Sequence, residues 1–78
     1  MKIDIRLIGR LEEYWNTDEP LEIDEGATVN EALAALGIPE EDAGMIALNG
    51  SSVAKKTRNS QRLTEGDSIT IMAPVHGG

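Results

Sequence analysis

A single strong helix signal, over residues 28–37, limits the folds open to this chain. Thr28 followed by Glu31 fits a capping box, in which each side chain bonds the other residue's backbone N–H. Gly37 suits the left-handed conformation that closes a helix, and Pro39 prevents the helix from resuming. The apolar residues between them recur at helical spacing on one face: Val29, Ala32, Leu33 and Leu36. Such a helix must bury that face, so the rest of the chain has to supply a surface for it.

Segments of alternating apolar and polar residues on both sides of the helix predict a sheet. In the first of them, Ile3, Ile5 and Leu7 share one face, and a later one turns tightly at Asn49-Gly50. These segments are residues 1–9, 21–25, 45–56 and 68–73. We therefore expect an α+β fold, with a mixed four- to five-stranded sheet covered on one face by the helix. The other face of the sheet stays available to partners.

The acidic composition argues against some partner classes. The 78 residues include 14 acids and 7 bases, for a formal net charge of −7. Such a surface repels a phosphate backbone, so we expect no nucleic acid partner. Two readings of the charge stay open: it keeps the protein in solution, or it matches a basic docking face on another protein.

Several kinds of chemistry lack the residues they require. The sequence has no cysteine and one histidine, His76, which excludes disulfides, thiolate ligands and a cysteine nucleophile, and makes a zinc site improbable. No phosphate-binding glycine motif occurs. The apolar runs are short and the N-terminal segment mixes charges with apolar residues, so we expect a cytoplasmic protein with no membrane span, metal or bound cofactor.

The last six residues, Ala-Pro-Val-His-Gly-Gly, raise a separate question. Residues 1–73 form the expected domain, and residues 74–78 are predicted to be a flexible tail. Pro74 cannot donate to a sheet ladder, so the final strand should end near Ala73. From there the chain reaches about 20 Å when fully extended. This end is either frayed or a working part.

The whole chain resembles the ubiquitin-like sulfur carriers of the ThiS/MoaD family. The resemblance is carried by the β-grasp order of elements, "LNG" at 48–50, "LTEGDSITIMAPV" at 63–75 and the terminal Gly77-Gly78. Its length is typical of the small subunit of molybdopterin synthase, although Ala73 and His76 depart from that type's double-proline ending. Relatives also serve thiamine synthesis, transfer-RNA thiolation, tungsten-cofactor synthesis or covalent protein tagging.

The resemblance implies that Gly78 carries the chemistry and that this chain alone is not an enzyme. An E1-like adenylating partner, using ATP and magnesium, would activate the Gly78 carboxyl as an acyl-adenylate, and sulfur would then give a thiocarboxylate. The cargo would pass to the large subunit of molybdopterin synthase or another acceptor enzyme. Gly77 and Gly78 have no Cβ and suit a narrow channel, while Pro74 stiffens the stem. Val75 and His76 complete the threading segment.

Other residues have both a functional and a plain reading. His76 either orients the reactive end or is a solvated spacer. Met72 and Arg6 are expected on the open sheet face, as an adaptable docking surface or shielded by neighbours. Tyr14 and Trp15 are expected to cover a core edge. A basic segment forms either a solvated loop or a partner contact; its residues are Lys55, Lys56, Arg58 and Arg62.

Three functions remain open at this point. The first is a sulfur carrier for molybdopterin synthesis, with thiamine or transfer-RNA thiolation as other pathways. The second is a protein modifier joined through Gly78 to a target lysine. The third is a ubiquitin-like interaction domain whose terminus has no chemical role.

Overall fold

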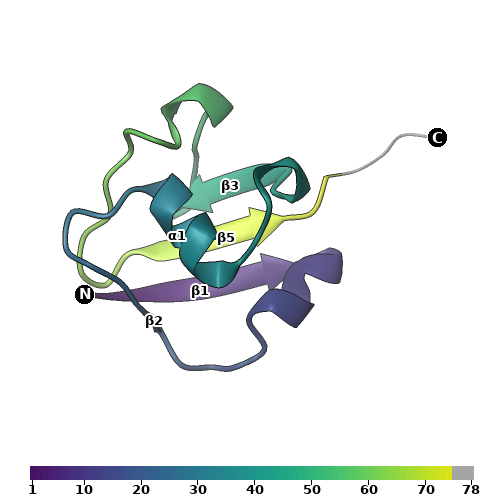
Figure 1. Ribbon diagram of the computed structural model, residues 1–78, viewed down its shortest axis with the longest axis horizontal. Helices are drawn as coiled ribbons and strands as arrows, with labels where there is room; N and C mark the ends of the chain where they lie inside the picture. Colours follow the sequence, from purple (N-terminus) through teal and green to yellow (C-terminus); the bar gives the residue numbers. More distant parts are fainter. Residues whose placement is uncertain (75–78) are drawn as a thin grey trace.

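The computed structural model describes residues 1–74 and shows a twisted sheet with a helix packed across it (Figure 1). The strands and the α-helix are, in chain order, β1 (Lys2–Ile8), β2 (Leu21–Glu22), α1 (Val29–Leu36), β3 (Met45–Leu48), β4 (Ser51–Ser52) and β5 (Ser68–Met72). Short 3-10 helices in the connections are η1 (Gly9–Tyr14), η2 (Glu40–Asp42) and η3 (Lys55–Thr57).

Across the described residues, the five-stranded sheet has the order β2-β1-β5-β3-β4. β1 and β5 pair in parallel, from Asp4 opposite Ser68 to Ile8 opposite Met72. The remaining pairs are antiparallel, so the sheet is mixed as expected. The strand nearest the C-terminal tail is therefore the central strand of the sheet. This arrangement is the ubiquitin-like β-grasp fold.

The capping signals place α1 where the sequence predicts it. The Thr28 hydroxyl accepts a hydrogen bond from the Glu31 N–H at 3.3 Å, and the Glu31 carboxylate accepts one from the Thr28 N–H at 3.1 Å. Gly37 adopts a φ of 79° at the other end, and its N–H donates to the Ala34 carbonyl at 3.1 Å. The capping box and the glycine closure are both confirmed.

The Asn49-Gly50 turn joins β3 and β4 as a tight hairpin. Both residues have positive φ, 50° for Asn49 and 86° for Gly50, which is the backbone of a type I′ turn. Asparagine and glycine tolerate this conformation better than other residues. Leu48 and Ser51 then pair directly across the turn. The predicted hairpin is confirmed, with a return strand of two residues.

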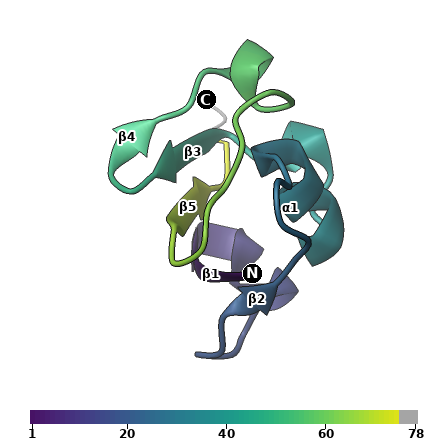
Figure 2. The same cartoon turned by 90° about the vertical axis from the view of Figure 1, so that its left-hand side faces the viewer.

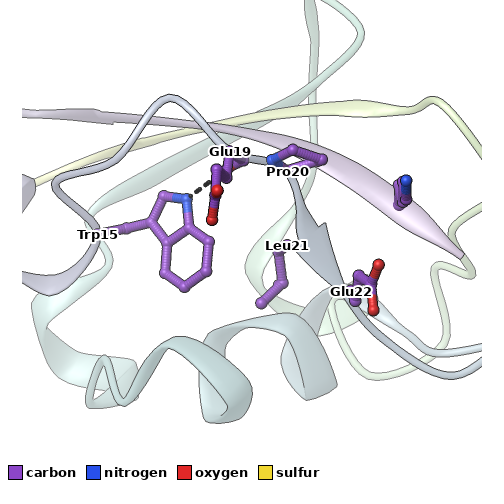
Figure 3. A pocket seen from close by; sticks show the side chains of 6 residues that line it. Trp15, Glu19, Pro20, Leu21 and Glu22 are labelled. Carbon is purple, nitrogen blue, oxygen red and sulfur yellow. Dashed lines mark hydrogen bonds between the residues drawn. The ribbon is translucent and has the colours of Figure 1, made fainter.

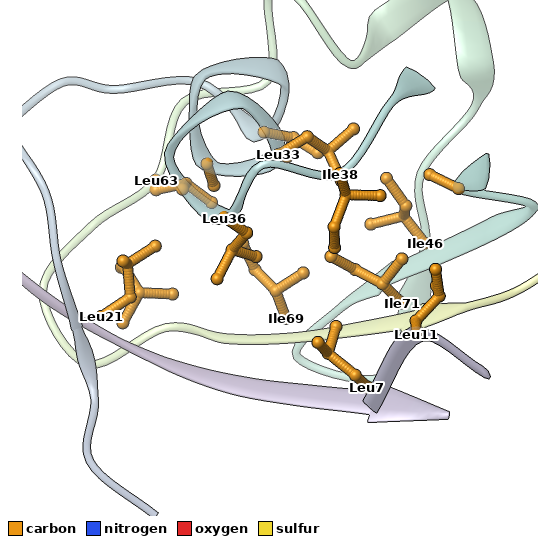
Figure 4. Packing of buried hydrophobic residues seen from close by; sticks show 14 residues of the cluster. Leu7, Leu11, Leu21, Leu33, Leu36, Ile38, Ile46, Leu63, Ile69 and Ile71 are labelled. Carbon is orange, nitrogen blue, oxygen red and sulfur yellow. The ribbon is translucent and has the colours of Figure 1, made fainter. Parts of the chain in front are cut away.

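The core lies between α1 and one face of the sheet (Figure 4). All four predicted apolar positions of the helix are buried. They meet a sheet surface built from alternate residues of the three central strands, among them Ile3, Leu7, Ile46, Ile69 and Ile71. Turned by 90°, the molecule shows α1 on one side of the sheet only (Figure 2). The opposite sheet face is left for other contacts.

The structure departs from the sequence-based expectation in the first connection. Pairing along residues 21–25 ends after Ile23, which exchanges backbone hydrogen bonds with Met1, because the chain then turns at Gly26, where φ is 81°. Trp15 packs against the core edge as expected. Tyr14 does not cover that edge, since it is 37% exposed.

Candidate functional site

The C-terminal tail leaves the sheet at the end of β5, its central strand, and we call residues 72–74 the root of the tail. The Met72 carbonyl accepts a hydrogen bond from the Gly44 N–H at 2.9 Å, and the Ala73 N–H donates to the Ile8 carbonyl at 3.4 Å. Pro74 follows, half-buried, so the strand ends where its missing N–H requires. Four tail residues with predicted roles lie outside the described part of the chain: Val75, His76, Gly77 and Gly78.

An apolar row crosses the open sheet face beside this root. Register places Ile8 of β1, Met72 of β5 and Met45 of β3 side by side, and they are 42%, 36% and 54% exposed. Met72 and Met45 also line a shallow depression of about 280 Å³. The sequence pattern predicted Met72 on this open face but not Ile8 and Met45. Strand alternation could have placed both of them there, because each alternates with residues that face the helix. We call these three residues the open-face row.

Arg6 stands in the next row of the same face. It is exposed and lies opposite Thr70 of β5, as the alternation along the two strands predicts. Its guanidinium adds one cation beside the apolar residues. This geometry suits a docking surface with an apolar centre and a charged neighbour. Contact of Arg6 or Met72 with a partner stays a prediction.

The basic segment is not one surface patch. Lys55 and Lys56 are exposed on η3, where a solvated loop and a partner contact both remain possible. Arg62 is also exposed, but its guanidinium donates to the Gly26 carbonyl at 2.9 Å and so closes the loop before α1. Lys55 and Lys56 therefore remain free to meet a partner, whereas Arg62 already has a structural role.

The expectation that Arg58 is solvated or faces a partner is wrong. It is 2% exposed, and its two terminal nitrogens donate to the carbonyls of Ala43 at 3.1 Å and Gly44 at 3.3 Å. A charged group is buried at large cost unless it is hydrogen-bonded. These two carbonyls supply the needed acceptors, so Arg58 links the loop after α1 to the segment after η3.

A second hollow lies at the β2 edge of the sheet, with a volume of about 480 Å³ (Figure 3). Trp15 and Leu21 form part of its wall, and the Trp15 indole N–H donates to the Glu19 carbonyl at 3.1 Å. That bond closes a loop of five residues and fixes the ring against the core. The arrangement favours the packing reading of Trp15.

Among residues 1–74, one carboxylate has a shifted pKa, at the end of β5 remote from Pro74. The pKa of Asp67 lies below its ordinary value because the Asn49 side chain donates to the carboxylate at 3.0 Å. The Thr64 backbone N–H adds a second bond at 2.8 Å. Asp67 thus stabilises the turn before β5, away from the tail.

Within residues 1–74, no three His, Cys, Asp or Glu side chains are grouped so as to hold a metal ion. None of the helices in that range is both long and apolar enough to cross a membrane.

These features define a class of protein: a β-grasp domain in which residues 73–76 separate the last, central strand from Gly77-Gly78 in the sequence. The sequence profile of the ThiS family matches residues 5–78. The chain therefore belongs to the ThiS family, whose members are small ubiquitin-like sulfur carriers. None of the functionally curated proteins matches the sequence significantly.

Solved structures of similar proteins agree with this assignment. A Pyrococcus furiosus protein described as subunit 1 of a molybdopterin converting factor is 26% identical, with a TM-score of 0.72 over 96% of this chain and 99% of its own. A complex of subunits 1 and 2 of the factor from Helicobacter pylori 26695 contains a chain 25% identical, with a TM-score of 0.60 and full coverage of both chains. The thiamine biosynthesis protein ThiS of Geobacter metallireducens, 20% identical with full coverage and a TM-score of 0.71, shares the fold.

Proposed function

We propose that this protein carries sulfur as a thiocarboxylate on Gly78 and donates it, as the small subunit of a synthase, to molybdopterin synthesis. One observation carries the proposal. The sequence that ends in Gly77-Gly78 continues directly from the central strand of the sheet, beside the exposed open-face row. A partner that covers this row is thereby adjacent to the root of the reactive end.

The chemistry needs activation because a carboxylate is a poor electrophile. The Gly78 carboxylate attacks the α-phosphorus of ATP, pyrophosphate leaves, and the product is an acyl-adenylate. A sulfur nucleophile at the oxidation level of sulfide then attacks the acyl carbon, and AMP leaves with the bonding electron pair. The resulting thiocarboxylate is anionic at neutral pH and is a soft nucleophile. No cysteine of this chain is required.

The partners supply the catalytic groups in this proposal. An E1-like adenylating enzyme binds ATP and magnesium, and the large subunit of molybdopterin synthase accepts the sulfur. This chain contributes the tail and the docking face and binds no cofactor itself. Both steps take place in the cytoplasm, where ATP is available.

Docking would use the open-face row and Arg6 beside it, with the exposed Lys55 and Lys56 of η3 as further contacts. Burial of these partly exposed apolar side chains by a partner stabilises the complex. Methionine adapts to surfaces of different shape, and this chain must meet two enzymes in turn. Charged neighbours then select the partner and speed the encounter.

The assignment to molybdopterin synthesis rests on chain length and on the Pyrococcus furiosus relative, which is described as a converting-factor subunit. The Helicobacter pylori relative is recorded in a complex with subunit 2 of its factor, and we extend that arrangement to this chain. Thiamine synthesis and transfer-RNA thiolation are the other pathways that the same chemistry can serve.

Intact mass spectrometry of the protein isolated from its own host tests the central claim. Replacement of one oxygen by sulfur at the C-terminus is expected, and both Gly78→Ala and deletion of Gly78 should abolish it while the fold is kept. Normal thiocarboxylate formation in either variant would rule out the proposal. A ladder of higher-mass conjugates would instead support a protein modifier joined through Gly78. An unmodified terminus under every growth condition would favour a plain interaction domain.

Reconstitution assigns the pathway. Thiocarboxylated protein is offered separately to the large subunit of molybdopterin synthase, to a thiazole-forming acceptor and to a transfer-RNA thiolating enzyme, and sulfur loss is followed by mass. Transfer to the first alone is expected.

The variant His76→Ala in the same assay decides whether that side chain orients the tail, and an unchanged rate marks it as a spacer.

A further inference from the structure

The loop before β3 approaches the root of the tail more closely than any side chain would allow. A Cβ added to Gly44 would lie 2.5 Å from the Pro74 Cα and 2.7 Å from the Pro74 nitrogen. A real Cβ atom essentially never lies this close to another heavy atom. Both contacts here are with backbone atoms, which cannot rotate away as a flexible side chain can. Gly44 does not adopt the left-handed conformation, so it is the lack of space that requires a glycine here.

Arg58 holds this loop from behind. Its guanidinium donates to the carbonyls of Ala43 and Gly44, while the Gly44 N–H donates to the Met72 carbonyl. The main chain of Arg58 is fixed as well, because its carbonyl accepts from the Asn30 N–H at 3.0 Å in the first turn of α1. A continuous series of hydrogen bonds thus runs from α1 through Arg58 to the last residues of β5.

Burial of this arginine is costly in a domain of this size. Arg58 is 2% exposed, and within residues 1–74 its Nε has no hydrogen-bond partner. An apolar side chain of similar length would fill the space without leaving a donor unpaired. The guanidinium differs from such a side chain in that its planar fork can fix two successive carbonyls at once. That property concerns geometry and not volume.

We propose that Arg58 and Gly44 form a clamp that fixes where Pro74 leaves the sheet, and that both act as positioning residues for the reaction at Gly78. The inference rests on the proposed sulfur-carrier function. The carboxyl must enter a partner's site while the sheet face is docked, so the position of the root limits where the end can reach. A displacement of about an ångström away from the chemistry can lower a rate by up to about a hundredfold. In this proposal neither residue acts on the reacting atoms themselves.

The test compares variants in the adenylation step, followed by ATP–pyrophosphate exchange with the activating enzyme. Gly44→Ala is the principal variant, because its added methyl group must push Pro74 away. Arg58→Met removes the two donors at similar volume, and Arg58→Lys restores a cationic donor group without the planar fork. We expect kcat to fall at least about tenfold in Gly44→Ala and Arg58→Met, with KM changed less than about threefold. Arg58→Lys should be intermediate.

Gly66→Ala is the matched control. Gly66 has a φ of 86° in the turn at the other end of β5, and nothing lies within 4 Å of an added Cβ. The alanine strains the backbone and lowers stability without touching the tail root, so kcat and KM should stay at wild-type values. A similar loss of kcat in Gly66→Ala would mean that reduced stability causes the effect, and would overturn the clamp.

The remaining outcomes are also decisive. A rise in KM at constant kcat, or wild-type kinetics in Gly44→Ala, overturns the inference while the proposed function stands. If the wild type is not adenylated either, the proposed function itself fails and takes the inference with it. Should Arg58→Met not fold, Gly44→Ala still gives the answer. Amide hydrogen exchange at Gly44 in Arg58→Lys then reports whether the bond to the Met72 carbonyl has loosened.

Discussion

The side-chain amide of Asn49 donates to the Asp67 carboxylate at 3.0 Å and so joins two turns that are 18 residues apart. The side-chain oxygen Oδ1 of Asn49 in turn accepts from the Ser68 N–H at 2.9 Å. The hairpin turn of β3–β4 and the turn before β5 are therefore held as one unit at this end of the sheet.

Loss of the Asp67 charge should weaken the protein at neutral pH more than at acidic pH. The folded-state pKa of Asp67 lies below its ordinary value of 3.8, with the Asn49 bond as the main cause. Its contribution is therefore fully present above the unfolded-state pKa and is lost as the pH falls through the folded-state value. Asp67→Asn should lower the free energy of unfolding by about 1 kcal/mol at pH 7. Urea unfolding should show this gap closing below pH ~4.

Asp4→Asn, at an exposed position of β1, provides the control for that experiment. It removes the same charge but keeps the backbone bond from the Asp4 N–H to the Asp67 carbonyl at 2.9 Å, so its effect should be small at both pH values. A gap between the wild type and Asp67→Asn that stays constant down to pH ~2 would contradict the assignment.

The capping box should contribute measurably to the stability of α1. Thr28→Ala removes the hydroxyl that accepts from the Glu31 N–H, and should lower the free energy of unfolding by about 1 kcal/mol. Thr28→Ser keeps an acceptor in the same place and should lose much less. Thermal or urea unfolding of the two variants distinguishes them, and equal losses would show that the methyl group matters instead of the bond.

A charge on the open-face row should weaken partner binding without weakening the fold. Met45 is 54% exposed, so Met45→Lys should change the free energy of unfolding by less than about 0.5 kcal/mol. Covering a new ammonium group costs free energy at an apolar contact, and affinity for the activating enzyme should fall at least about tenfold. Ala35→Lys adds the same charge on the exposed side of α1 and should leave affinity unchanged. Titration calorimetry measures both.

The centre of the sheet should tolerate little loss of volume. Ile69 on β5 has no exposed surface, and Ile69→Val should lower the free energy of unfolding by about 1 kcal/mol, while Ile69→Ala should lower it by at least ~2 kcal/mol. Ile8→Val at the 42% exposed position should cost much less. Chemical unfolding gives the three values, and similar losses at Ile8 and Ile69 would contradict the assigned core.

Local signals made the fold predictable. The capping box at Thr28, the glycine closure at Gly37 and the Asn49-Gly50 turn are each encoded within a few neighbouring residues, and the structure has them where the sequence places them. Strand alternation likewise assigned Ile69 and the other core positions of β5 to the helix side.

The role of Arg58 could not be predicted in the same way. It lies in a polar segment that looks solvated, and its two acceptors are backbone carbonyls 14 and 15 residues away, which no local pattern reveals. Gly44 was equally hidden, since its contact with Pro74 exists only once β3 and β5 are paired. The register that aligns Ile8, Met72 and Met45 is also a property of the assembled sheet. The roles of Gly77 and Gly78 rest on the sequence alone, because both lie outside the described residues.

The parallel pairing of β1 with β5 has a consequence for biosynthesis. The two strands are separated by most of the chain, and β5 occupies the middle of the sheet, so a ribosome must finish nearly the whole polypeptide before the domain can close. A truncated product that lacks β5 has neither a completed sheet nor a Gly-Gly end to offer. Under the proposed function, such a product also lacks Gly78 and so could not be loaded with sulfur.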